Sequence, residues 1–205
     1  MKKLKSNKVF AIGFQKTGTT SLGKALDILG YQVCGYWEFR KYAELQNLTL
    51  DMIRQKAFEL TESYDAFKDT PWPIFYQELD RKYPNSKFIL VIRDTDSWIN
   101  SVVNDFCSWD NSIHKLIYGV GHPKVNESVW IERYERHNKE AIDYFKDRPN
   151  DFLLLNLKTV KLSGWEKICT FLGEEKPEIE WPHTNKKWQK KNMLFIQKIL
   201  NKIKS

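Results

Sequence analysis

The sequence predicts an α/β protein of one domain, with a central parallel sheet flanked by helices. Short apolar runs that indicate buried strands alternate along the chain with stretches of helical periodicity, which is typical of parallel strands connected by helices. The chain has 205 residues, of which 41% are hydrophobic and 14% aromatic, enough for one substantial core. Since no internal repeat or low-complexity tract divides it, we expect a single domain over residues 1–205.

The first half of the chain alternates strands and helices. An apolar strand is predicted at 9–12, and a helix follows at 21–29, where apolar residues recur at helical spacing before Gly30. The later elements are recognised by apolar runs or by helical spacing between turn residues, and are a short strand at 31–34, a charged helix at about 50–63, a brief strand at 64–67 and a helix at 74–82.

The second half contains the most apolar strand, at 87–92, entered through a Pro84-Asn85 turn. Its continuous apolar character predicts burial on both faces of the sheet. The elements after it are expected to be helices at 96–107 and 127–145, a strand at 152–155 and an amphipathic helix at 163–172 closed by Gly173.

A glycine-broken loop joins the first strand to the first helix. Glycines permit a tight turn in which backbone N–H groups converge, and the start of the following helix adds unpaired donors and a positive dipole end. This predicts a P-loop-like phosphate cradle within the three-layer architecture that the alternating strands and helices imply. The expected binding residues are Gln15, Lys16, Thr17, Gly18, Thr19, Thr20 and Ser21. In nucleotide triphosphatases a lysine follows the second glycine, whereas here Thr19 stands there and Lys16 precedes Gly18.

A second anion-binding element is predicted where the strand at 87–92 ends. It delivers Arg93 to the carboxyl edge of the sheet, where open α/β sheets bind ligands. Ser101 follows on the helix predicted after it.

The loop and the Arg93–Ser101 pair, in this order, resemble the sulfotransferases that use 3′-phosphoadenosine 5′-phosphosulfate (PAPS). The resemblance extends over roughly residues 8–185. It implies that the loop holds the 5′-phosphosulfate, that Arg93 and Ser101 hold the 3′-phosphate, and that Lys16 stabilises the charge that develops on the bridging oxygen. It also implies transfer of a sulfuryl group to a hydroxyl of a carbohydrate or small metabolite, with no metal ion.

The general base is assigned by correspondence with the same family. The loop upstream of Arg93 that bears the base there is Phe67-Lys68-Asp69-Thr70-Pro71 here, so Asp69 is the expected base. Trp72, directly after this loop, is expected to line the acceptor pocket. Four histidines compete for the role of base, namely His114, His122, His137 and His183, with the first two flanking a glycine-containing segment expected to form a lid.

Two other classes of function stay open at this stage. A P-loop kinase or nucleotide triphosphatase is disfavoured by Thr19 in the lysine position and by Arg93 where a magnesium-binding aspartate would stand. A non-catalytic nucleotide- or RNA-binding module is suggested only by the aromatic content and by the net charge of +7. The chain has no recognised RNA-binding signature, so no nucleic-acid partner is expected.

The spacing of cysteines and histidines indicates the compartment and the metal content to expect. The two ends of the chain indicate whether a membrane segment is expected. Three widely separated cysteines argue against disulfides and for a reducing compartment, and no histidine pair has metal-ligand spacing. The basic start is followed by too short an apolar run for a signal peptide or membrane anchor, so a cytoplasmic location without a transmembrane segment is expected. Residues 186–204 predict a basic amphipathic helix that packs on the domain or lies on a membrane. The oligomeric state is left open.

Overall fold

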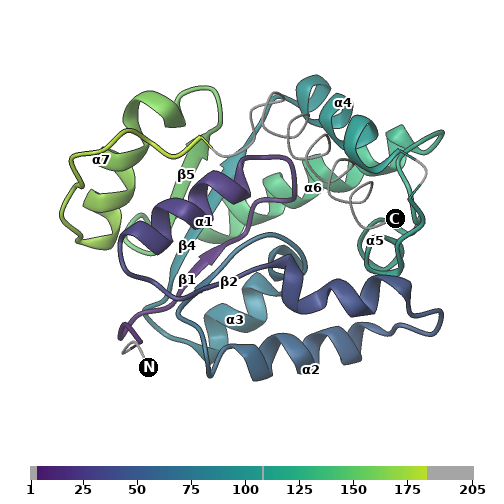
Figure 1. Cartoon of the computed structure of the whole chain (residues 1–205), viewed down its shortest axis with the longest axis horizontal. Helices are drawn as coiled ribbons and strands as arrows, with labels where there is room; N and C mark the ends of the chain where they lie inside the picture. The colour runs from purple at the N-terminus through teal and green to yellow at the C-terminus, as the bar shows by residue number, and fades with distance from the viewer. Residues whose placement is uncertain (1–3, 108, 184–205) are drawn as a thin grey trace, which may run out of the picture.

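The computed structural model describes residues 4–107 and 109–183, and the structural statements below concern these residues. Its centre is a five-stranded sheet in the order β2-β3-β1-β4-β5, in which all neighbouring strands are parallel (Figure 1). The strands are β1 (Val9–Ala11), β2 (Val33–Cys34), β3 (Ala66–Phe67), β4 (Lys87–Ile92) and β5 (Phe152–Asn156). The predicted α/β class with a single parallel sheet is therefore confirmed.

Helices cover both faces of this sheet, because alternate strand residues point to opposite sides. Phe10 of β1 packs into a large cluster with residues of the second, third and sixth helices, whereas Val9 and Ala11 pack into a smaller cluster with the first and seventh. The helices are α1 (Thr19–Ile28), α2 (Leu50–Leu60), α3 (Tyr76–Lys82), α4 (Thr95–Phe106), α5 (Ser112–Tyr118), α6 (Glu127–Phe145) and α7 (Val160–Leu172).

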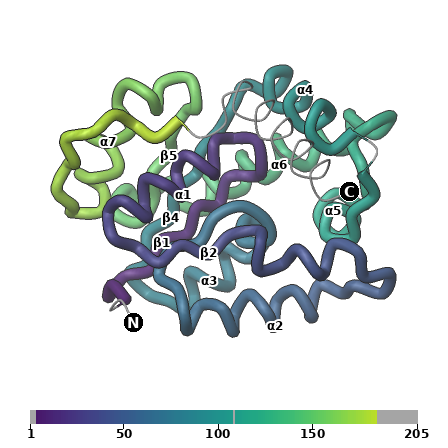
Figure 2. The backbone as a smooth tube through the Cα atoms, in the orientation of Figure 1, coloured from purple at the N-terminus to yellow at the C-terminus, as the bar shows by residue number. Residues whose placement is uncertain are grey.

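From β1 at the centre the chain runs to the edge strand β2, returns to β3 beside β1, and then crosses to β4 and β5 on the other side, as the tube in Figure 2 shows. The connection after β1 leads to one half of the sheet, whereas the connection after its neighbour β4 leads to the other half. This reversal creates a crevice at the carboxyl end of β1, the place where open α/β sheets bind ligands. The phosphate loop and Arg93 both lie at this edge, after β1 and β4 respectively.

The helix ends differ from the prediction by a few residues, and three short elements were not predicted. The segments are the 3-10 helix η1 (Tyr36–Glu44), the 3-10 helix η2 (Trp72–Phe75), which replaces the start of the helix expected from Ile74, and α5. The segment expected to be a lid, 117–121, begins with the last two residues of α5, and Tyr118 there is buried and stacked on Trp130 with ring centroids 3.7 Å apart. The stack ties the end of α5 to the core.

Within residues 4–107 and 109–183, no helix combines the length and the apolar character needed to cross a membrane. The basic helix predicted for 186–204 lies outside the described residues.

Candidate functional site

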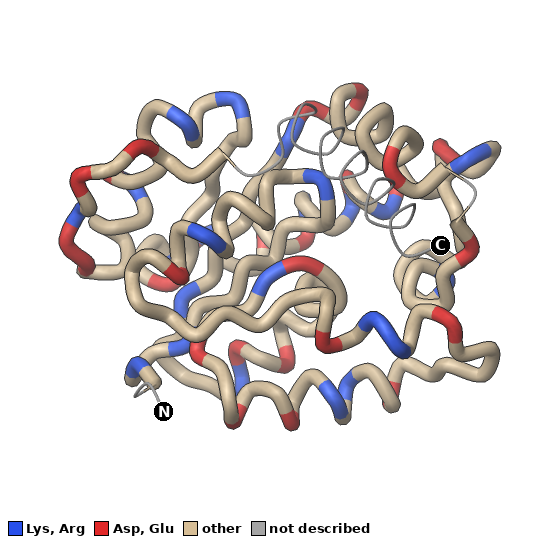
Figure 3. Tube along the Cα trace, viewed as in Figure 1, with Lys and Arg blue, Asp and Glu red and all other residues tan. Residues whose placement is uncertain are grey.

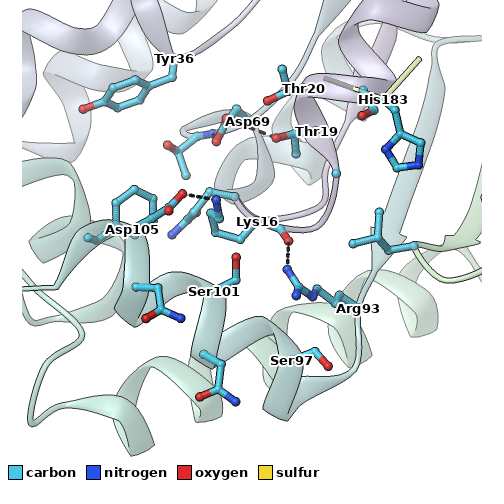
Figure 4. Close-up of a pocket in the computed structure, with 18 of the residues that line it drawn as sticks. Lys16, Thr19, Thr20, Tyr36, Asp69, Arg93, Ser97, Ser101, Asp105 and His183 are labelled. Carbon is cyan, nitrogen blue, oxygen red and sulfur yellow. Dashed lines mark hydrogen bonds and ion pairs between the residues drawn. The ribbon is translucent and has the colours of Figure 1, made fainter. Parts of the chain in front are cut away.

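A cavity of about 1030 Å³ opens at the carboxyl edge of the sheet. Its wall comes from the β1–α1 loop, the segments after β3, β4 and β5, and the helices α4 and α5 (Figure 4). The residues that line the cavity include Gln15, Lys16, Gly18, Thr19, Thr20, Ser21, Tyr36, Asp69, Arg93, Ser101, Asp105, Phe106, Trp109, His114, Leu157, Lys158, Lys161 and His183. The structure thus brings together most of the residues that the sequence assigned to the site.

The β1–α1 loop has the backbone shape of an anion cradle. Lys16 and Gly18 have φ angles of 69° and 102°, so the chain turns sharply into α1. Gly18 is the N-cap of α1 and has no side chain to cap the first turn, and the starts of helices are places where proteins bind anions. A Cβ at Gly18 would lie 2.6 Å from Leu157 Cδ1, the movable end of a side chain, so the positive φ is the stronger reason for glycine here.

Side chains beneath the cradle fix it to the core. The Thr17 hydroxyl donates to the Phe14 carbonyl at 2.7 Å, and the Trp98 indole donates to the Gln15 carbonyl at 2.9 Å. Gln15 in turn donates through Nε2 to the Tyr118 hydroxyl at 2.7 Å. Thr17 is fully buried and its side chain shapes the loop from below, whereas the other predicted loop residues line the cavity.

Arg93 is held at the end of β4, as predicted. The Tyr134 hydroxyl lies 2.8 Å from both the backbone N and the carbonyl O of Arg93, which fixes its main chain. Its guanidinium donates through Nη1 to the Lys16 carbonyl at 3.1 Å, so the cation lies against the cradle. Ser101 lines the same cavity from α4.

Additional cations that the sequence analysis did not assign come from the segment after β5. Leu157 donates its backbone N–H to the Ile92 carbonyl at 2.9 Å, which places this segment beside the end of β4. Lys158 and Lys161 therefore line the cavity on the same side of the sheet edge as Arg93. The sequence feature that could have identified them is a lysine that closely follows a predicted strand, because such a residue lies at the carboxyl edge of the sheet. His183, one of the four histidines considered, also lines the cavity.

Asp69 lies at the end of β3 with a left-handed backbone, φ 69°. Its Oδ1 accepts from the Thr70 backbone N–H at 2.9 Å, and its Oδ2 accepts from the Thr19 hydroxyl at 3.3 Å. These contacts hold the carboxylate against the start of α1, facing the cavity (Figure 4). A carboxylate has about four lone-pair positions, so it retains capacity to accept from a ligand hydroxyl.

The ammonium of Lys16 forms an ion pair with Asp105, a residue that the sequence analysis missed. Figure 4 shows Tyr36, Asp69 and Asp105 to one side of Lys16, and Arg93 and His183 to the other. Asp105 follows Ser101 by one helical turn on α4, so both side chains lie on the same face of that helix. The i, i+4 spacing from Ser101 is the sequence feature from which Asp105 could have been predicted to face the site.

Trp72, predicted to line the acceptor pocket, lies instead in the core. Its side chain is fully buried and its ring centroid is 4.5 Å from that of Phe67, 5.7 Å from Phe39 and 6.4 Å from Phe10. The η2 turn directs the indole under the sheet, where burial of a large ring is favourable. The aromatic wall of the cavity is made by Tyr36, Phe106 and Trp109 together with His114.

Burial separates the candidate histidines. His114 lines the cavity but is only 2% exposed, and burial lowers its pKa to about 4, which keeps it neutral at pH 7. His137 lies in the core within 2.7 Å of the Ile12 carbonyl, and burial likewise lowers its pKa to about 4. His137 and His122 are not among the described residues that line the cavity. His114 is therefore the buried histidine that lines the cavity, with its ring against those of Phe106 and Trp109.

Positive and negative residues are interspersed over the whole trace in Figure 3. The net charge of +7 is that of the whole chain, whereas the described residues contain 24 Lys and Arg against 26 Asp and Glu, a net charge of −2. The cationic residues that concern the cavity are the individual side chains of Lys16, Arg93, Lys158 and Lys161.

Comparison with known proteins agrees with this geometry. A family model described as a sulfotransferase domain matches residues 8–189. The "Ava biosynthesis cluster protein M" of Aspergillus versicolor is 27% identical over 210 residues, covering 86% of this chain and 80% of that protein. A sulfotransferase from Alicyclobacillus acidocaldarius has a similar fold, with a TM-score of 0.55 at 14% identity over 94% of this chain and 92% of that one.

Proposed function

This chain belongs to the sulfotransferase domain family, and we propose that it transfers a sulfuryl group from PAPS to a hydroxyl of a carbohydrate or small metabolite. In this reaction the acceptor oxygen attacks sulfur, and the bond between sulfur and the oxygen of the 5′-phosphate breaks. The products are a sulfate ester and adenosine 3′,5′-bisphosphate (PAP). As in phosphoryl transfer, the protein contributes chiefly positioning and electrostatic stabilisation.

The residues of the cavity suit a donor with two separated anionic groups. The uncapped start of α1 and the turn at Gly18 supply backbone N–H donors for the 5′-phosphosulfate. Arg93, Ser101 and the two lysines after β5 suit a second phosphate, the one at the 3′ position. A donor with only a 5′ polyphosphate chain would leave this second group of donors without a ligand.

Lys16 is proposed to act on the leaving group. Its ammonium lies in the cavity between the Arg93 side and the Asp69 side, where the two substrates would meet. A cation there stabilises the negative charge that accumulates on the bridging oxygen as its bond to sulfur breaks. This contribution is made in the transition state, so it raises the rate more than the affinity.

Asp69 is proposed to accept the proton of the acceptor hydroxyl. Its carboxylate faces the cavity and is held by Thr19 and by its own loop. A positioned carboxylate of this kind accelerates such a step by about 10²–10⁴-fold. The acceptor itself would lie against the rings of Tyr36, Phe106 and Trp109.

The observation that carries the proposal is the joining of two anion-binding elements, because the Arg93 guanidinium donates directly to the carbonyl of Lys16 in the cradle. The test is a pair of calorimetric titrations, one with PAP and one with ATP plus Mg²⁺. Tight binding of PAP with weak binding of ATP supports the proposal. Preference for ATP with Mg²⁺ would instead indicate a kinase or triphosphatase, and binding of neither would contradict the proposed donor.

A further inference from the structure

The ammonium of Lys16 is engaged by a carboxylate inside a cavity suited to anions. Asp105, in the last turn of α4, forms the ion pair across the cavity (Figure 4). The two side chains are only 16% and 25% exposed, so the pair is partly sheltered from water. Such a pair is screened less by solvent and salt than one on the open surface.

The backbone of Lys16 is fixed, whereas its side chain has room to change partner. Its left-handed φ of 69° sets the turn of the cradle, and its carbonyl is held by Arg93. The ammonium is carried on a flexible four-carbon stem. A change of partner therefore requires side-chain rotation only, with the cradle unchanged.

Asp105 occupies an unfavourable place for a negative charge. The carboxyl end of a helix carries the negative end of its dipole, and the last turn of α4 contains no basic residue. The same carboxylate also faces the cavity in which we place the anionic donor. Lys16 counters both effects, so Asp105 and the donor would compete for its ammonium.

We propose that Asp105 is a positioning residue that holds Lys16 in the donor-free protein and yields the ammonium to the 5′-phosphosulfate when the donor binds. This inference rests on the proposed function. The ion pair and the donor exclude each other, so donor affinity is reduced by whatever free energy the pair contributes. Binding of the donor then leaves the Asp105 carboxylate on the same side of Lys16 as Asp69 and Tyr36.

The test measures binding of PAP by calorimetry to the full-length protein and to Asp105→Asn. Removal of the competing carboxylate should tighten PAP binding by about threefold to tenfold, the range expected for a partly sheltered ion pair. Asp105→Ser should give the same direction of change. Asp96→Asn is the matched control, because Asp96 lies on the same helix, is exposed and removes the same charge outside the cavity.

A double-mutant cycle establishes whether Asp105 acts through Lys16. In a Lys16→Met background, Asp105→Asn should change PAP affinity by less than about twofold, since the remaining through-space repulsion is screened by salt. An equal gain in both backgrounds would overturn the proposal. So would an unchanged PAP affinity in Asp105→Asn, or a turnover loss of about 10²-fold or more at unchanged affinity, which would make Asp105 the base. If the wild-type protein does not bind PAP, the proposed function fails first and this inference with it.

Discussion

The 3′-phosphate is the group that separates the proposed donor from other adenine nucleotides, and Arg93 is the residue assigned to it. Arg93→Ala should therefore weaken PAP far more than adenosine 5′-phosphate, because only PAP carries the 3′ group. Arg93 is half-buried at the cavity wall, and the guanidinium hydrogen bond that the structure gives, through Nη1, goes to the Lys16 carbonyl. A guanidinium has five N–H donors in all.

The magnitude follows from this partial burial. Truncating one partner of a buried, charge-assisted contact costs about 2 to 5 kcal/mol, and a half-buried arginine belongs near the lower end. A loss of about 2 to 3 kcal/mol corresponds to roughly 30- to 150-fold weaker PAP binding. The lost bond to the Lys16 carbonyl should disturb the cradle slightly and affect both nucleotides equally, by about threefold or less.

The assay is calorimetric titration of each nucleotide into the wild-type and variant proteins. Arg136→Ala serves as the control, because Arg136 is exposed, pairs with Glu132 on α6 and removes the same charge away from the cavity. The ratio of the two affinity losses is the quantity of interest. Equal losses for PAP and adenosine 5′-phosphate would refute the assignment of Arg93 to the 3′-phosphate.

Changes at four further residues test the chemistry and the stability of the protein. Lys16→Ala should abolish sulfuryl transfer while the unfolding temperature stays near the wild-type value, and Lys16→Arg should rescue poorly because a guanidinium is planar and bulkier; a near-wild-type rate in the alanine variant would remove Lys16 from the mechanism. Asp69→Asn should lower turnover by roughly 10²–10⁴-fold with little change in PAP affinity, as measured by steady-state kinetics and calorimetry. Normal turnover in Asp69→Asn together with loss of turnover in His114→Gln would instead identify His114 as the base. Trp72→Ala should lower the free energy of unfolding by about 3–5 kcal/mol in denaturant titrations. The control Trp37→Ala, whose side chain is 74% exposed, should lower it by less than about 0.5 kcal/mol. Similar small losses in both variants would contradict the burial of Trp72. Finally, burial lowers the folded-state pKa of both His114 and His137 from 6.5 to about 4. Between these pH values the unfolded chain binds more protons than the folded protein, so the free energy of unfolding should fall as the pH drops from about 6.5 to 4. The decrease should be up to about 1.4 kcal/mol per pH unit for each histidine. His137→Gln should flatten that slope in denaturant titrations at several pH values, and an unchanged slope would contradict it.

Local sequence patterns sufficed for the sheet and for two elements at its carboxyl edge, the cradle and Arg93. β4 is a continuous apolar run, and its end alone places Arg93 at the edge where ligands bind. The cradle was equally accessible, because the glycine spacing and the start of α1 are adjacent in sequence. In both cases the chemistry depends on residues that are close along the chain.

The remaining parts of the site depend on contacts that no local pattern contains. Trp72 follows Asp69 by three positions, but the η2 turn directs its ring into the core. Asp105 meets Lys16 only because α4 packs beside the cradle, where the Trp98 indole on the same helix binds the Gln15 carbonyl. α5 is too short and its composition too mixed to be recognised, yet Tyr118 anchors it to Trp130.

Transfer of the sulfuryl group itself is the most direct test of the account. The purified protein should be incubated with PAPS labelled in the sulfuryl group and a panel of sugars and small hydroxylated metabolites, with Lys16→Ala as the inactive control. Label should appear in at least one acceptor together with an equal amount of PAP, and the control should form neither. PAP binding without transfer to any hydroxyl, or release of label that is the same in the Lys16→Ala control, would contradict it.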